Sequence, residues 1–331
     1  MAPEAASTPQ EAMTPEEAMS EMHAVHAHRR GGPERLLYGY APVPRLQPGE
    51  VLVAVHSASI TRGELQWPAT WTTAFDDSGE PRTPIIPSKE VSGTVDQLGP
   101  ATSRFRVGDD VYGLIPFLRD GAAAEFVAVP EKVLAPKPPS LDHDQCAALP
   151  LAGLTAWQGL VRHAGLRAGQ RVLVHGGAGG VGSLVVQVAA ALGAAVTATA
   201  TGADLDFVRG LGAERVVDYT SRPFEEEVRD VDVVFDTVGG DTAARSWRVL
   251  RPGGTLVSIV APPPPPPGPE SRAVFFVVEP DQAGLGELTA LVESGRLTPR
   301  VDRVVPLQHT AEAYAALEQE HHQGKIVLHI A

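Results

Sequence analysis

The most constraining feature of this sequence is an apolar run that leads directly into a cluster of glycines. Residues 171–175, Arg-Val-Leu-Val-His, have the composition of a buried strand, and the run 176–182, Gly-Gly-Ala-Gly-Gly-Val-Gly, follows at once. An apolar helix is expected from about Val181 to Leu192, so the glycines lie in a turn between a strand and a helix. This order is typical of the first unit of a parallel α/β sheet.

The glycine spacing adds a chemical expectation. Residues 177–182 satisfy the pattern G-x-G-x-x-G within a strand–helix–strand unit of about 30 residues. We expect Gly177 to permit the tight turn, Gly179 to let the backbone approach a diphosphate, and Gly182 to let the helix pack on the strand. Amides at the helix start hold phosphates, helped by the helix dipole. The motif predicts a dinucleotide site at Gly177, Ala178, Gly179, Gly180 and Val181.

The pattern of elements changes near Pro150. Before it, short β-like runs such as 50–55, 92–95 and 106–113 alternate with Pro, Gly and Asp clusters, which favours a barrel or sandwich. After it, strands alternate with helices and predict a doubly wound parallel sheet. Strands are expected at 171–175, 195–201, 215–218, 231–236, 254–260 and 273–278, with a helix at 203–211. The predicted fold class is therefore α/β, with a Rossmann sheet plus a mostly β domain.

Charge and cysteine content exclude several classes of function. The formal net charge of −13, without a basic cluster, argues against a nucleic-acid partner. The longest apolar stretch, 184–200, is interrupted by Gln, Gly and Thr, so no membrane span is expected. One cysteine, Cys146, fits a reducing compartment, and a cytoplasmic location is expected. Residues 1–22 carry five glutamates without Lys or Arg, which indicates a flexible acidic tail rather than a signal peptide, although Thr14-Pro15-Glu16-Glu17 has the form of a helix start.

Each of two further segments allows two interpretations. Trp67 and Trp71 lie in an expected loop, where they line a substrate pocket or cover the end of the barrel. Residues 262–267 are six consecutive prolines, which enter neither helix nor sheet and form a stiff spacer or a ligand for a proline-binding module.

The dinucleotide is expected to be NADP(H), with NAD(H) not excluded. NAD sites place Asp or Glu at the end of the second strand, and here that position falls at Ala200 or Thr201. A carboxylate would repel a 2′-phosphate, so its absence favours NADP, although Asp204 is near. Arg209 or Arg222 is the candidate for the missing positive charge.

Motifs along nearly the whole chain beyond residue 22 resemble one family. They are Gly31-Gly32-Pro33-Glu34, the segments 107–113 and 147–156, His175 through Gly182, the segment 235–240, and Gly324-Lys325-Ile326-Val327-Leu328. In this order they resemble the medium-chain dehydrogenase/reductase superfamily, in its zinc-free quinone oxidoreductase branch, similar to zeta-crystallin. The resemblance implies a catalytic barrel-like (GroES-like) domain at 23–150, a Rossmann domain at 151–283, and a return to the catalytic domain at 284–331.

The resemblance also implies contacts to the cofactor. Thr155 is expected beside the nicotinamide, Thr201 and Tyr219 at the adenosine end, and Val238, Val260 and Phe276 along the cofactor channel. It further implies a homodimer joined through the last Rossmann strand, 273–278, whose Phe275-Phe276-Val277-Val278 suits a buried edge.

The zinc-dependent branch would place metal ligands where this chain has Thr61, Lys89 and Leu151. Lysine and leucine are not usual zinc ligands, so no metal is expected. The zinc-free branch commonly has asparagine at the position of Thr61 and aspartate at that of Glu64, and these departures put the orientation of the substrate in question. Lys89 is expected at the surface, paired with Glu90, and the alternative is that it offers positive charge to an enolate.

Without a metal, reduction of an activated double bond is favoured over alcohol–ketone interconversion, because hydrogen-bond donors suffice to stabilise an enolate. We expect NADPH-dependent reduction of a small apolar quinone or enone, with Thr61 as donor or positioning residue. No residue is identified as a dedicated acid. Two alternatives stay open: an enoyl-thioester reductase in biosynthesis, and a dinucleotide-binding protein with little turnover.

Overall fold

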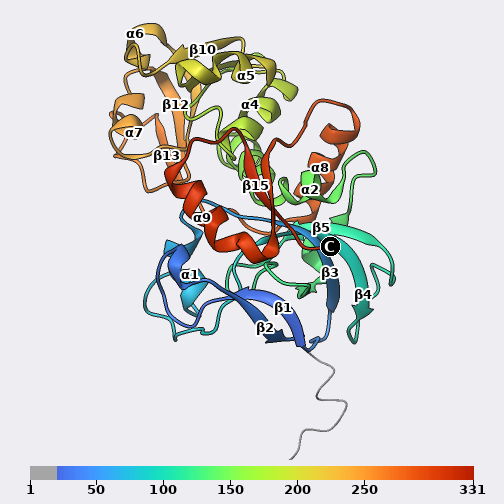
Figure 1. Cartoon of the computed structure of the whole chain (residues 1–331). Coiled ribbons are helices and arrows are strands. Elements are labelled where there is room, and N and C mark those ends of the chain that lie inside the picture. Colours follow the sequence, from blue (N-terminus) through green and yellow to red (C-terminus); the bar gives the residue numbers. More distant parts are fainter. Residues whose placement is uncertain (1–20) are drawn as a thin grey trace, which may run out of the picture.

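The computed structural model describes residues 21–331, which form two lobes (Figure 1). One lobe is built on a six-stranded sheet and the other on a seven-stranded sheet. The C-terminal segment, red in Figure 1, runs between them. The predictions for residues 1–20, including the expected helix start at Thr14, lie outside the described residues. The acidic tail was expected to extend to residue 22, whereas Glu21 and Met22 begin the first strand and Met22 is buried.

The six-stranded sheet is parallel throughout and doubly wound. Its strand order is β10-β9-β8-β11-β12-β13, so the chain leaves β8 in one direction and returns to add strands on its other side. The strands are β8 (Arg171–Val174), β9 (Ala195–Ala200), β10 (Arg215–Asp218), β11 (Val231–Asp236), β12 (Leu250–Ser258) and β13 (Arg272–Phe275). Three successive residues of β8, Val172 to Val174, are fully buried, as expected of a strand covered on both faces.

Helices connect these strands. They are α4 (Gly182–Ala191), α5 (Leu205–Gly210), α6 (Phe224–Glu227) and α7 (Gly240–Ser246). The expected Rossmann sheet is confirmed, and β10 and β11 have the predicted bounds. The last strand is shorter than expected, because it ends at Phe275 and leaves 276–278 outside the sheet.

The second sheet is mostly antiparallel and includes the last strand of the chain. Its order is β14-β15-β3-β4-β5-β7, with β6 paired to β3. The strands are β3 (Glu50–Ser59), β4 (Glu90–Leu98), β5 (Asp110–Leu114), β6 (Phe126–Pro130), β7 (Leu134–Pro136), β14 (Val301–Pro306) and β15 (Lys325–His329). Because β15 pairs with β3, the last residues return to the lobe in which the chain began. A separate antiparallel pair, β1 (Glu21–His26) and β2 (Leu37–Pro42), lies beside this sheet.

The remaining helices lie mainly near the boundary between the sheets. They are α1 (Pro68–Trp71), α2 (His143–Ala147), α3 (Pro150–Trp157), α8 (Gln282–Glu293) and α9 (Thr310–Gln319). Helix α2 begins at a capping box, in which the Asp142 carboxylate accepts the N–H of Gln145. Tyr112 of β5 donates its hydroxyl to the carbonyl of Leu285 in α8 at 2.8 Å, which fixes this helix on the second sheet.

The six prolines at 262–267 lie in neither helix nor strand, as predicted. They connect β12 to β13, and the indole N–H of Trp247 donates to the Pro264 carbonyl at 3.2 Å. This placement favours the stiff spacer. Among residues 21–331, no helix has the length and apolar character needed to cross a bilayer.

Strand β13 is the outer strand of the parallel sheet, and Phe275 and Val277 beside its free edge are exposed. We therefore propose that two copies pair through this edge.

Substituting Asp for both Phe275 and Val277 should shift the mass measured by light scattering from dimer to monomer, because two charges would then be buried at the interface. Val304→Asp, at an exposed position of β14, is the control that should leave the mass unchanged. A wild-type chain at monomer mass would contradict the proposal.

Two stacked histidines fix α2 on the second sheet. The rings of His56 in β3 and His143 in α2 are 4.2 Å apart and 15° from parallel, and His143 Nδ1 lies 2.8 Å from Ser92 Oγ. Burial, reinforced by the neighbouring His56, lowers the pKa of His143 to about 4.

Since this pKa lies below the unfolded value, the unfolded chain binds a proton first as the pH falls. The buried neutral form of His143 therefore contributes its full stability above about pH 6.5, and this contribution is lost as the pH falls from 6.5 to about 4. We predict that His143→Gln flattens the decline of Tm in this window. Exposed His309→Gln should keep the wild-type slope, and an unchanged slope in His143→Gln would refute the assignment.

Candidate functional site

The glycine-rich turn follows β8 directly and is fixed by β9. The N–H of Gly176 donates to Thr199 Oγ1 at 3.2 Å, and that of Gly177 donates to the Thr199 carbonyl at 2.9 Å. The left-handed residue of the turn is Gly176, which has φ of 70° and directly precedes the G-x-G-x-x-G motif.

Steric crowding explains the other glycines. A Cβ on Gly177 would lie 2.9 Å from Ala198 Cβ, so this residue is small because β9 is close. A Cβ on Gly182 would lie 2.0 Å from the Gly176 carbonyl oxygen, so only glycine lets α4 begin this close to the strand. At Gly179 the nearest such atom is 3.5 Å away, which leaves open space beside the backbone.

The same turn presents unpaired donors. Within residues 21–331, the N–H groups of Ala178 and Val181 donate to no acceptor. Val181 is the N-terminal cap of α4, a helix of ten residues, so these donors lie at the positive end of its dipole. Free amides at an open helix start suit the diphosphate of a dinucleotide.

The C-terminal strand of the other lobe packs against this turn. Gly179 and Gly324 form a parallel bridge, and the N–H of Gly324 donates to the Ala178 carbonyl at 3.1 Å. The Lys325 side chain lies over the turn, since a Cβ on Gly180 would be 2.9 Å from Lys325 Cδ.

Lys325 leads from the turn to a buried polar cluster. Its Nζ lies 2.5 Å from Glu90 Oε2 and 2.8 Å from Thr61 Oγ1. Glu90 also accepts the hydroxyl of Ser59 at 2.5 Å and the N–H of Leu151 at 2.9 Å. The sequence pattern pointed to Thr61 alone. Glu90 and Lys325 were not predicted as site residues. The only sequence feature that could have indicated them is that each is a charged residue within an otherwise mostly apolar segment.

A second buried group lies beside this cluster. Glu64 accepts the N–H of Ser88 at 2.7 Å and the hydroxyl of Tyr314 at 2.8 Å, and burial raises the pKa of Glu64. Lys89 is not a surface residue paired with Glu90, as the sequence suggested. It is buried, donates to the Arg119 carbonyl, and burial lowers its pKa to about 8.

The three positions that hold zinc in the zinc-dependent branch do not suit the metal here. Thr61 accepts a hydrogen bond from Lys325, Lys89 is a cation or an amine engaged with a carbonyl, and Leu151 has no donor atom in its side chain. In the described part of the chain, no three His, Cys, Asp or Glu side chains are arranged to hold a metal ion.

The end of β9 contains a bridge between the lobes. Asp204 is buried and accepts from Thr201 Oγ1 at 2.5 Å, and from His321 Nε2 and Gln323 Nε2 of the C-terminal segment at 3.0 and 2.8 Å. Its carboxylate is therefore occupied by protein donors. Tyr219, also at this end, is about half exposed.

The other residues expected to contact the cofactor differ in how far they are buried. Val238 and Val260 are exposed and adjacent, since a Cβ on the intervening Gly239 would be 2.9 Å from Val260 Cγ1. Thr155 is buried, and its hydroxyl donates to the Leu151 carbonyl at 2.6 Å. Phe276 packs in the core with its ring 4.4 Å from that of His163.

The two tryptophans, Trp67 and Trp71, lie in different environments. Trp71 has 3% of its surface exposed and donates its indole N–H to the Leu65 carbonyl at 2.8 Å, so it covers the end of the barrel and does not line a pocket. Trp67 is partly buried and meets Phe117 edge to face at 5.4 Å, while Phe117 also contacts exposed Phe75 at 6.3 Å. These three rings form an apolar cluster suited to a substrate wall.

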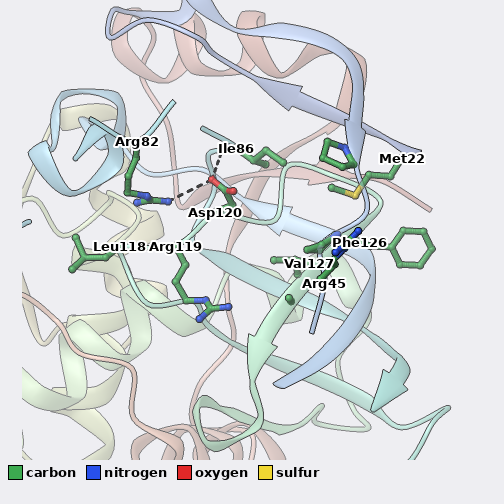
Figure 2. A pocket seen from close by; sticks show the side chains of 13 residues that line it. Met22, Arg45, Arg82, Ile86, Leu118, Arg119, Asp120, Phe126 and Val127 are labelled. Atoms are coloured by element: carbon green, nitrogen blue, oxygen red, sulfur yellow. Dashed lines mark hydrogen bonds and ion pairs between the residues drawn. The ribbon is translucent and has the colours of Figure 1, made fainter. Parts of the chain in front are cut away.

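A groove of about 370 Å³ lies elsewhere on the catalytic lobe (Figure 2). It is lined by Met22, Phe126 and three arginines, and Figure 2 shows Arg82 paired with Asp120. It contains neither the glycine-rich turn nor Thr61, so we do not assign the cofactor to it.

Comparison with known proteins agrees with this geometry. Residues 47–139 match the family model described as alcohol dehydrogenase GroES-like domain, and residues 211–328 match the one described as zinc-binding dehydrogenase. The chain is 35% identical over 308 residues to an Arthroderma benhamiae protein named "Probable zinc-binding oxidoreductase, mitochondrial", covering 87% of this chain and 91% of that one.

Two further relatives bear on the chemistry. The Arabidopsis thaliana NADPH-dependent alkenal/one oxidoreductase, chloroplastic, is 35% identical, with 87% of this chain and 74% of that protein covered. The structure of the quinone oxidoreductase from Coxiella burnetii superposes with a TM-score of 0.83 at 29% identity, covering 94% of this chain and all of that one. The chain is an oxidoreductase that belongs to the medium-chain dehydrogenase/reductase superfamily, in its quinone oxidoreductase, zeta-crystallin-like branch.

Proposed function

We propose that this protein reduces a quinone or an α,β-unsaturated carbonyl compound with NADPH and without a metal ion. The observation that carries the proposal is the polar cluster of Thr61, Glu90 and Lys325 beside the glycine-rich turn, in which Thr61 stands where the zinc branch would have a ligand. The names of the alkenal and quinone oxidoreductase relatives support the same substrate class.

The dinucleotide would be held by the free amides of Ala178 and Val181 at its diphosphate. Thr201 and Tyr219 would lie at its adenosine end, and Val238 and Val260 would offer exposed apolar surface along its length. The alkyl part of the Lys325 side chain would stay packed against the turn. When bound, the reduced nicotinamide supplies a hydride to the substrate.

Thr61 is the residue proposed to act on the substrate. As the double bond gains a hydride, negative charge develops on the carbonyl oxygen, and a hydroxyl donor stabilises that charge. The Trp67–Phe117 ring pair would exclude water from the same space and bind the apolar part of the substrate. The enzyme then contributes mainly orientation and charge stabilisation.

A location in the cytoplasm was expected from the single cysteine. The Arthroderma benhamiae and Arabidopsis thaliana relatives are named as mitochondrial and chloroplastic, so their names do not support this location.

The first test is a cofactor-oxidation screen of the purified protein with NADPH and NADH. We expect oxidation with quinones and conjugated ketones, unaffected by chelators, and loss of activity in Gly179→Leu because the side chain fills the diphosphate space. Gly210→Ala, at an open position of α5, is the matched control. Activity restricted to enoyl thioesters would select the biosynthetic reductase, and tight NADPH binding without any turnover would select the binding protein.

The second test concerns NADP preference. Asp204 is not free to bind ribose hydroxyls, and of the two candidate arginines Arg209 is paired with Asp206 at 2.7 Å, whereas Arg222 forms no ion pair within residues 21–331. Arg222→Gln should therefore weaken NADPH binding about tenfold in calorimetry, the loss of one charge-assisted contact, and leave NADH binding unchanged. Arg209→Gln is the control. Equal effects on both dinucleotides would refute the role of Arg222.

A further inference from the structure

Lys325 occupies an unusual position for a cation. It begins β15, its side chain is 7% exposed, and its alkyl part lies over Gly180 of the glycine-rich turn. Its Nζ contacts Glu90 and Thr61, which come from β4 and from the loop after β3. One side chain therefore contacts the cofactor-binding turn and the proposed substrate donor together.

Glu90 fixes the position of this amine through a buried ion pair. The carboxylate is fully buried, and both of its oxygens are engaged, Oε2 by Lys325 and Ser59 and Oε1 by the Leu151 amide. A buried carboxylate needs a positive partner. The pair is neutral overall, and the amine is fixed rather than free to follow the substrate.

Thr61 is left with a hydrogen to donate. Its oxygen accepts from Lys325 at 2.8 Å, and its only other neighbour in the cluster, Glu90 Oε2, is 3.5 Å away. That distance exceeds the usual 2.5–3.0 Å of an O–H···O bond. Thr61 as a residue is partly exposed, which is consistent with its hydroxyl reaching an acceptor outside the cluster.

We propose that Lys325 is a positioning residue that supplies charge, and finally a proton, to the substrate carbonyl oxygen through the Thr61 hydroxyl. The inference rests on the proposed function. Lys325 is then the proton source that the sequence did not identify, in addition to packing against the turn.

The step balances as follows for an enone. The hydride brings an electron pair to the β-carbon, the electrons of the carbon–carbon double bond form the new bond between the α-carbon and the carbonyl carbon, and the carbonyl electrons move to oxygen. That oxygen takes the proton of the Thr61 hydroxyl, and Thr61 takes one from the Lys325 ammonium. The product leaves as an enol, which becomes the ketone in water, and solvent returns a proton to the Lys325 amine.

The main experiment is a double-mutant cycle. Lys325→Gln and Thr61→Val should each lower kcat for cyclohexenone and phenanthrenequinone about 100-fold, the usual cost of losing one oxyanion donor. The double variant should be no slower than either single one, because both residues act along one chain. Lys325→Arg should recover part of the rate, and Lys132→Gln, which removes an exposed lysine, should match the wild type.

A second readout does not depend on turnover. 4-Nitrophenol absorbs in the visible range only as its anion and mimics a charged carbonyl oxygen. The wild-type protein saturated with NADP⁺ should bind it as the anion, whereas Thr61→Val and Lys325→Gln should bind it as the neutral phenol or at least tenfold more weakly. Circular dichroism and NADPH affinity show whether each variant is folded and still binds cofactor.

The outcomes separate the two proposals. If the wild type turns over neither substrate class but binds the phenolate through Lys325, the proposed function fails and the charged relay stands. If the wild type is active and the variant effects are additive, with phenolate binding unchanged, the relay is overturned and the proposed function stands. Should Lys325→Gln not fold, Lys325→Arg and Thr61→Val decide the case by the same two measurements.

Discussion

The close approach of Gly324 to the glycine-rich turn is the contact on which the rest of the site depends. The bridge between Gly179 and Gly324 joins two sheets that are otherwise separate in the chain's topology. Gly324 has φ of 98°, and a Cβ there would lie 2.2 Å from the Arg300 carbonyl oxygen, so no other residue permits this path. The next residue, Lys325, is thereby placed between the turn and Glu90.

The buried pair that results is costly to break. Both Glu90 and Lys325 are withdrawn from water, and removing one partner of such a pair typically costs about 3–5 kcal/mol because the other charge is left alone. Replacement of both by apolar residues would avoid that penalty. Stability alone does not require a charged pair at this position, and the proposed chemistry at Thr61 gives the pair a function.

Much of the fold was readable from the sequence because it depends on local patterns. The alternation of strands and helices from Arg171 to Asp236 specified the parallel sheet, and the bounds of β10 and β11 were predicted correctly. The left-handed conformation of Gly176 could not be read from the pattern, because this residue precedes the motif that the pattern defines. The contact of Lys325 with Glu90 and that of Asp204 with His321 could not be predicted, because the two residues of each contact lie 235 and 117 positions apart in the chain, respectively. Trp71 was ambiguous for a similar reason: only the folded barrel shows which ring faces the core.

The bridge from Asp204 to His321 and Gln323 has a kinetic consequence. It spans the two lobes at the end where an adenosine would enter, and it satisfies a carboxylate that has almost no access to water. Separation of the two lobes at that end would pull both donors away and leave the carboxylate with Thr201 alone. If the proposed dinucleotide leaves by that route, its release includes the cost of this loss, which is borne by three side chains that need not touch the nucleotide.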